Sequence, residues 1–108
     1  MTNTDFFTTT YVPYQEAVMT PGTCYVRCYI IKKYLLESYG AASPSNISPS
    51  DINGVYDEME SRNLANNTIY GTRAALMSFF KMASEHGECY DNPVADDRIV
   101  RQEIERRA

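Results

Sequence analysis

The chain of 108 residues has no tract of eighteen apolar residues, so it lacks the apolar run that a membrane-spanning helix requires. Its start also lacks the basic flank and apolar stretch of a secretory signal, because Met1 is followed by the polar run Thr2–Thr4 and then Asp5. With 44% apolar residues, the sequence predicts one soluble globular domain in the cytoplasm, without membrane contact.

Residues that bind metals or exchange disulfides are few: Cys24, Cys28, Cys89 and the single histidine, His86. The cysteine count is odd, and Cys24 and Cys28 lie four apart in a predicted helix, which is a poor arrangement for a disulfide. The four side chains could in principle form a Cys3His zinc set. We favour buried free thiols and a histidine that suits a helix C-terminus, and we expect no metal and no cofactor.

The patterns of common active sites are lacking as well. The spacing supports no Ser/His/Asp or Cys/His set, and no glycine-rich loop that could cradle a phosphate. The acidic group Asp57, Glu58 and Glu60 falls on the outward side of a predicted helix, where it is most simply solvated. Catalysis by this chain is therefore not expected.

An excess of basic residues, which is typical of nucleic-acid binders, is also absent, since the formal net charge is −4. The placement of charge matters more than its sum. Between Thr20 and Gly87 six basic residues balance six acidic ones, and much of the acidic excess lies in Glu88, Asp91, Asp96 and Asp97.

What the sequence does contain is helical apolar spacing from end to end. No alternating strand pattern competes, so the predicted class is all-α, a small bundle of four to five helices. The expected helices cover residues 6–19, 24–39, 49–62, 67–86 and 96–107. Pro13 should kink or restart the first, Gly40 should end the second, and a capping box of Ser48 and Asp51 should start the third. Asn66 or Asn67 should cap the fourth helix, and Gly87 should end it.

Two faces of the predicted helix 67–86 carry different residues. One arc is core and holds Ile69, Leu76, Phe79, Phe80 and Ala83. Another is a stripe of small residues, Gly71, Ala74, Ala75 and Ser78, which we call the small-residue stripe. Either a tightly packed neighbouring helix or a nucleic-acid backbone fits such a stripe, and helix packing is favoured.

Two groups of side chains are candidate phosphate contacts. At the start of helix 67–86, Arg73 is accompanied by uncharged donors from Asn66, Asn67, Thr68 and Tyr70. Alternatively, the Arg73 guanidinium is solvated and its aliphatic stem packs on the core. Near the start of the helix 24–39 lie Thr20, Thr23 and Arg27. The outer arc of that helix interleaves lysines with aromatic residues, a pattern that suits a nucleic acid or a protein partner: Tyr25, Tyr29, Lys32, Lys33 and Leu36. The alternative is that a small bundle with nine tyrosines must leave some of them exposed.

Taken in order, these elements resemble the N-terminal core-binding domain of phage integrases and other tyrosine recombinases, a SAM-like orthogonal bundle. The resemblance rests on Thr23 and Gly40 at the two ends of one helix with Leu35 between them, on "ISPSDI" at residues 47–52, on "ANNTIYGTRAALMSFF" at residues 65–80, and on Gly87 followed by "DNP" at residues 91–93. Each motif alone is weak. Their order and spacing across residues 6–94 make the match fairly specific.

The resemblance implies one half of a clamp around duplex DNA, in residues 1–95, with residues 96–108 as the start of a linker. The other half would be a C-terminal catalytic domain of the same parent chain, with a tyrosine nucleophile, so this chain is expected to be inert alone. Other recombinase protomers on DNA are further expected partners. The family's geometry turns the starts of the second and fourth helices toward DNA, which selects Thr20, Thr23, Tyr25, Arg27, Asn66, Asn67, Thr68, Tyr70, Arg73 and, further along, Lys81.

We expect weak, salt-sensitive binding directed at the DNA backbone. Two alternatives stay open at this point. One is a small helical protein-interaction module that uses Tyr25, Tyr29 and Leu36, and the other is a stand-alone regulatory protein such as an excision factor.

Overall fold

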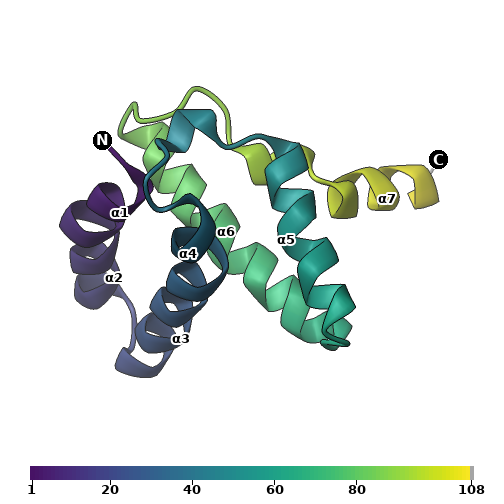
Figure 1. Cartoon of the computed structure of the whole chain (residues 1–108). Coiled ribbons are helices and arrows are strands. Elements are labelled where there is room, and N and C mark those ends of the chain that lie inside the picture. The colour runs from purple at the N-terminus through teal and green to yellow at the C-terminus, as the bar shows by residue number, and fades with distance from the viewer. Residues whose placement is uncertain (108) are drawn as a thin grey trace.

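The structure, a computed structural model, describes residues 1–107 and, among them, not the side chains of Ile104 and Arg107. The described residues form helices and connecting loops and no strand, so the all-α prediction is confirmed (Figure 1). In chain order the elements are α1 (Asn3–Phe6), η1 (Phe7–Tyr11), α2 (Val12–Val18), α3 (Pro21–Ile31), η2 (Lys32–Leu36), α4 (Glu37–Tyr39), η3 (Pro44–Asn46), α5 (Pro49–Ser61), α6 (Asn66–Glu85), η4 (Pro93–Asp96) and α7 (Arg98–Arg107).

The first helical stretch runs from Asn3 to Val18 and contains one π-helical turn, η1. Pro13 stands in the first turn of α2, where α-helical geometry resumes after η1. A proline fits the first turn of a helix because its missing N–H would have no helical acceptor there. The predicted restart at Pro13 is thus confirmed, and it takes the form of a widened turn before the proline.

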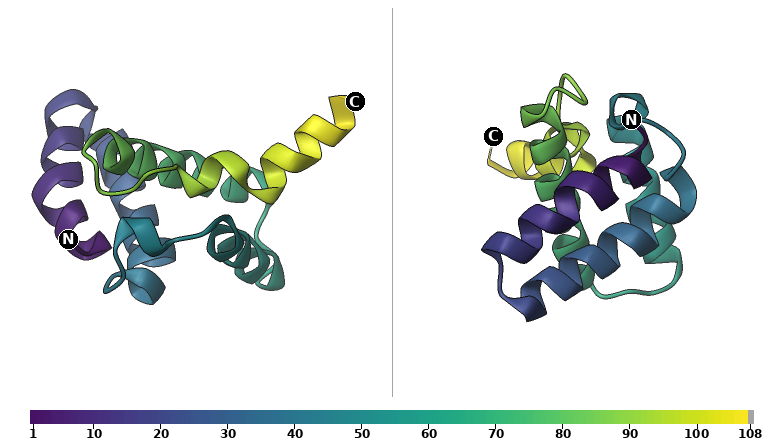
Figure 2. Two further views of the ribbon diagram at one scale, coloured as in Figure 1. Left: turned by 90° about the horizontal axis from the view of Figure 1, so that it is seen from above. Right: turned by 90° about the vertical axis from the view of Figure 1, so that its left-hand side faces the viewer.

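The second stretch runs antiparallel to the first, from Pro21 to Tyr39, and also contains a π-helical turn, η2 (Figures 1 and 2). It begins at Pro21, three residues before the predicted start. Gly40 follows it with φ −58°, so this glycine does not serve as a left-handed stop. It lies instead where the start of α1 comes close: the Gly40 carbonyl accepts from the Thr4 amide at 3.1 Å, and a Cβ there would lie 2.6 Å from the Leu36 carbonyl oxygen.

Helix α5 has the N-terminal cap that the sequence predicts. The Asp51 amide donates to Ser48 Oγ at 3.2 Å, and the Ser48 amide donates to Asp51 Oδ2 at 2.9 Å. The helix ends at Ser61, and Arg62 and then Asn63, whose φ of 58° is left-handed, close it. Its predicted apolar stripe is buried throughout: Ile52, Val55, Tyr56 and Met59.

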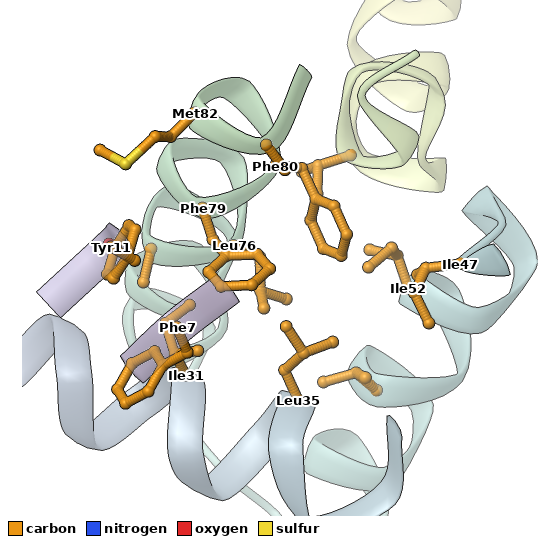
Figure 3. Close-up of a cluster of buried hydrophobic side chains, with 14 of the residues drawn as sticks. Phe7, Tyr11, Ile31, Leu35, Ile47, Ile52, Leu76, Phe79, Phe80 and Met82 are labelled. Atoms are coloured by element: carbon orange, nitrogen blue, oxygen red, sulfur yellow. The ribbon is translucent and has the colours of Figure 1, made fainter. Parts of the chain in front are cut away.

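Helix α6 crosses the middle of the bundle, and its apolar arc supplies the centre of the core (Figures 1 and 3). Phe79 makes edge contacts with Phe6 and Phe80, with ring centroids 5.5 and 5.1 Å apart. The predicted stop is confirmed by Gly87, whose φ is 76°. The predicted cap is wrong: the N-cap is Ala65, and Asn66 and Asn67 are the first two helical residues.

The chain after α6 packs back onto α5 and α6 through η4, and then α7 leaves the bundle (Figures 1 and 2). A helix near the predicted linker is thus present. Of its predicted apolar side, Ile99 is buried and Val100 is partly buried. Ala108 and the Ile104 side chain lie outside the part that the structure describes.

Candidate nucleic-acid interface

An open groove runs between α3 and α6, and it collects residues that the sequence selected from distant positions. From α3 and its cap it takes Thr20, Thr23 and Arg27, and from α6 it takes Gly71, Ala74 and Ala75 of the small-residue stripe. Its full lining is Thr20, Gly22, Thr23, Val26, Arg27, Ile30, Gly71, Ala74 and Ala75.

The small-residue stripe divides into two parts, one packed and one exposed, so the predicted helix packing is confirmed for one part. Ala75 is 2% exposed, and Ser78 Oγ is 2.7 Å from the Tyr11 hydroxyl and donates to the Ala75 carbonyl. That half packs against neighbouring helices. Gly71 and Ala74 are exposed, and a Cβ on Gly71 would meet nothing within 4 Å. The open half is therefore free for a ligand that approaches the main chain closely.

A second hollow continues the groove along α6 and contains Lys81. It is lined by Tyr14, Gln15, Met19, Arg27, Ser78, Lys81, Met82, Glu85 and His86. Arg27 lines both hollows, and its Nη1 donates to Oε1 of the buried Gln15 at 3.3 Å. From Gly71 to Lys81 the exposed side of α6 extends for about 15 Å at 1.5 Å per residue. Thr20, Thr23, Arg27 and Lys81 thus border one continuous surface, which we call the α3–α6 channel.

Sequence reasoning did not select Gln15, although it is the residue that positions Arg27. Its 2% exposure is unusual for a glutamine. The two residues are twelve apart and lie on different helices. Only the tertiary fold brings them together, and no local pattern marks Gln15.

The starts of α3 and α6 lie at the same edge of the bundle, the lower edge in Figure 1. Neither has a side-chain cap: Thr20 Oγ1 donates to Thr23 Oγ1 at 3.0 Å, and Ala65 offers no acceptor. The first N–H groups of both helices are therefore available to an anion. The predicted polar group at the start of α6 is exposed: Asn66, Asn67, Thr68 and Tyr70.

Arg73 does not point into solvent as expected. Its Nε lies 2.9 Å from Oδ2 of Asp97, a carboxylate with 0% exposure, and its Nη2 lies 3.4 Å from the Val94 carbonyl oxygen. The Tyr56 hydroxyl donates to the same Asp97 oxygen at 2.6 Å. This cluster, which we call the Asp97 junction, fastens the start of α7 to α5 and α6. It turns Arg73 away from the α3–α6 channel.

The charge balance of the central part changes once ion pairs are taken into account. Arg62 is paired with Glu58 and Arg73 with Asp97. Among residues 1–95 the remaining basic side chains make no ion pair: Arg27, Lys32, Lys33 and Lys81. Unpaired positive charge is thus concentrated on the α3–η2 helix and at Lys81, although residues 20–87 together carry no net charge.

Tyr25 lies on the other flank of α3, away from the α3–α6 channel. It is 73% exposed and borders an apolar groove between α3 and the first helical stretch, together with Tyr29 and Lys32. Lys33 Nζ lies 5.7 Å from the ring centroids of Tyr29 and Tyr34. Tyr25, Tyr29 and Lys32 of the predicted outer arc thus form a separate surface, and the structure does not bring Tyr25 together with the other candidate contacts. Leu36, predicted on the same arc, is partly buried and packs against the core.

The zinc set that the sequence allowed is not assembled. Cys24 and Cys28 lie together, but Cys89 contacts the Phe80 carbonyl and the His86 ring packs against Phe6. No group of three or more His, Cys, Asp or Glu side chains in residues 1–107 is arranged to hold a metal. Burial and the neighbouring Cys24 thiol raise the pKa of Cys28 to about 11, so this thiol is protonated near pH 7 and a poor nucleophile.

Comparison with known proteins gives no match to a family model, a curated protein or a solved structure. Within the described residues, none of the helices combines the length and apolar character needed to cross a bilayer.

Proposed function

We propose that this chain is the DNA-binding domain of a tyrosine-type site-specific recombinase and that it holds duplex DNA by its phosphate backbone during integration. The observation that supports this function best is the α3–α6 channel. It places Thr20, Thr23 and Arg27 beside the open half of the small-residue stripe.

Each part of the channel has a role in the proposed DNA binding. The uncapped start of α3 and the Thr23 hydroxyl, which accepts from Thr20 Oγ1, donate hydrogen bonds to phosphate oxygens. Arg27 and Lys81 supply charge without first breaking an ion pair. Gly71 and Ala74 lack the side-chain bulk that would keep a sugar–phosphate backbone away from the α6 main chain. Tyr70 and the Asn66–Thr68 turn extend the surface at one end.

The chain itself performs no reaction under this proposal. Strand cleavage would belong to a catalytic domain of the same parent chain, and assembly would involve other protomers on the same DNA, in the cytoplasm. Contacts to the backbone carry little sequence information. The domain therefore contributes affinity and register, while target choice depends on the whole enzyme.

The test is a salt series of DNA binding, measured by fluorescence anisotropy with a labelled duplex. Each phosphate contact contributes about 0.9 to the slope of log K against log salt concentration. Arg27→Ala and Lys81→Ala should each reduce that slope by about this amount. Lys33→Ala is the matched control, because it removes the same charge from a side chain that rests on Tyr29 and Tyr34. Absence of binding at low salt, or an equal effect of Lys33→Ala, would exclude the channel as the interface.

A protein-binding role is the second candidate, because Tyr25 and Tyr29 are 73% and 50% exposed beside an apolar groove. Aromatic residues that stay exposed next to apolar surface are typical of protein interfaces. NMR titration separates the two functions. DNA should shift the amide signals of Thr23, Arg27 and Gly71 and leave those of Tyr25 and Tyr29 unchanged. A complete lack of shifts along the channel would favour the protein-binding role.

A further inference from the structure

Two thiols face each other on the flank of α3 that the proposed DNA contact does not use. Cys24 Sγ and Cys28 Sγ lie 4.0 Å apart, one helical turn from each other. Both line the apolar groove between α3 and the first helical stretch, a hollow of about 570 Å³. The thioether residue Met19 lines the same groove, from the turn that precedes α3. Three sulfur-bearing side chains therefore border one cavity.

The helix keeps the two thiols from forming a disulfide. Side chains at i and i+4 of a helix have Cβ atoms about 5–6 Å apart, whereas a disulfide requires about 3.5–4.5 Å. The separation suits a single bridging atom much better. Two metal–sulfur bonds of about 2.3 Å span 4.0 Å at an angle of about 120°, the angle of a three-coordinate planar site.

The donor atoms favour a soft monovalent cation. Thiolate and thioether sulfur select Cu(I) over harder divalent ions. Two thiolates and one Cu(I) carry a net charge of −1, and Lys32, which lines the groove, can offset it. Glu16 lines the same groove and cancels the charge of Lys32, so the preference for Cu(I) rests on the sulfur donors and not on the local charge.

We propose that Cys24, Cys28 and Met19 form a binding site for Cu(I). Binding exchanges two thiol protons, which leave to solvent, for two copper–thiolate bonds, and the Met19 sulfur adds a neutral third donor. The oxidation state of the copper does not change. The two thiols lie outside the α3–α6 channel, whereas Met19 borders both that channel and this groove. The site does not depend on the proposed DNA-binding function.

The experiment is a competition titration of the reduced, tag-free chain with Cu(I) and a chromophoric Cu(I) chelator, under anaerobic conditions. The wild-type chain should withdraw one Cu(I) per chain and show thiolate-to-copper absorption in the ultraviolet. The double variant Cys24→Ser/Cys28→Ser should withdraw none, and Met19→Leu should bind at least tenfold more weakly. Cys89→Ser is the matched control and should behave as wild type, because Cys89 lies at the Phe80 carbonyl, away from this groove.

Circular dichroism of every variant checks that it is folded, and the wild-type titration is decisive in itself. No withdrawal of Cu(I) by the wild-type chain would overturn the site. Equal withdrawal by the double-serine variant, or loss of binding in Cys89→Ser with full helicity, would also overturn it. Unchanged affinity in Met19→Leu would remove Met19 from the ligand set and leave a two-coordinate site that contradicts the proposed geometry.

Discussion

Replacing Arg73 by alanine tests whether this side chain holds the fold together or is free to contact DNA. The substitution leaves the Asp97 carboxylate buried, with only the Tyr56 hydroxyl and the Val100 amide as partners. Removing one partner of a buried ion pair destabilises a protein by about 3–5 kcal/mol. Because the Arg73 side chain is 20% exposed, the lower value of about 3 kcal/mol is appropriate.

That loss converts into a shift of melting temperature. With an unfolding entropy of about 2.1 cal/mol/K per residue, a domain of this size should melt about 13 °C lower. The assay is thermal unfolding followed by circular dichroism. Arg62→Ala is the matched control: its pair with Glu58 is exposed on both sides, and such a pair contributes about 0.3–0.5 kcal/mol, or roughly 2 °C.

A mutant cycle separates the ion pair from the rest of the side chain. In the Asp97→Asn background, Arg73→Ala should destabilise much less than in the wild type, because the charge that Arg73 compensates is gone. Equal shifts of the melting temperature in Arg73→Ala and Arg62→Ala would contradict a structural role of Arg73. In that case Arg73 does not hold the Asp97 junction, and its guanidinium is available to DNA.

Three further outcomes are expected. Gly54→Ala and Gly71→Ala should each stabilise the chain by roughly 0.5–1 kcal/mol in urea unfolding, since a Cβ at either site meets nothing within 4 Å. Only Gly71→Ala should weaken DNA binding, and equal binding by both variants would argue against DNA contact at the small-residue stripe. Gly40→Ala should destabilise by about 1–3 kcal/mol in the same assay, because its Cβ would lie 2.6 Å from the Leu36 carbonyl oxygen, and a neutral result would contradict that close approach. Burial and the Asp97 carboxylate raise the pKa of Tyr56, so the folded chain keeps the phenol proton to higher pH than the unfolded chain does. The unfolding free energy should therefore fall as pH rises above about 10, and Tyr56→Phe should flatten that pH dependence.

The helices could be predicted because their signals are local. The Ser48–Asp51 capping box, the left-handed Gly87 and the apolar arc of α6 each depend on residues a few positions apart. The cap of α6 could not be predicted in the same way. Ala65 takes the extended backbone conformation of an N-cap, although the asparagines after it have the better side chains for that position.

The candidate site was only partly predictable, because electrostatic pairing depends on the tertiary fold. Asp97 counts as part of an acidic surface excess in the sequence, yet it is buried against Arg73, 24 residues away. Gln15 likewise positions Arg27 from another helix. Summed charge cannot reveal which basic side chains remain unpaired, and that property distinguishes Arg27 and Lys81 from Arg62 and Arg73.

The two π-helical turns, η1 and η2, have a consequence for the alignment of related sequences. Each contains one residue more than an α-helical turn, and this residue rotates everything after it by about 100° relative to a regular helix. In η1 the extra residue allows Phe6, Phe7 and Tyr11 all to face the core. A homologue could therefore lose one residue within Phe7–Tyr11 or Lys32–Leu36 by closing the wide turn into an α-helix. In an alignment, these are the positions inside helices where a single-residue gap is structurally reasonable.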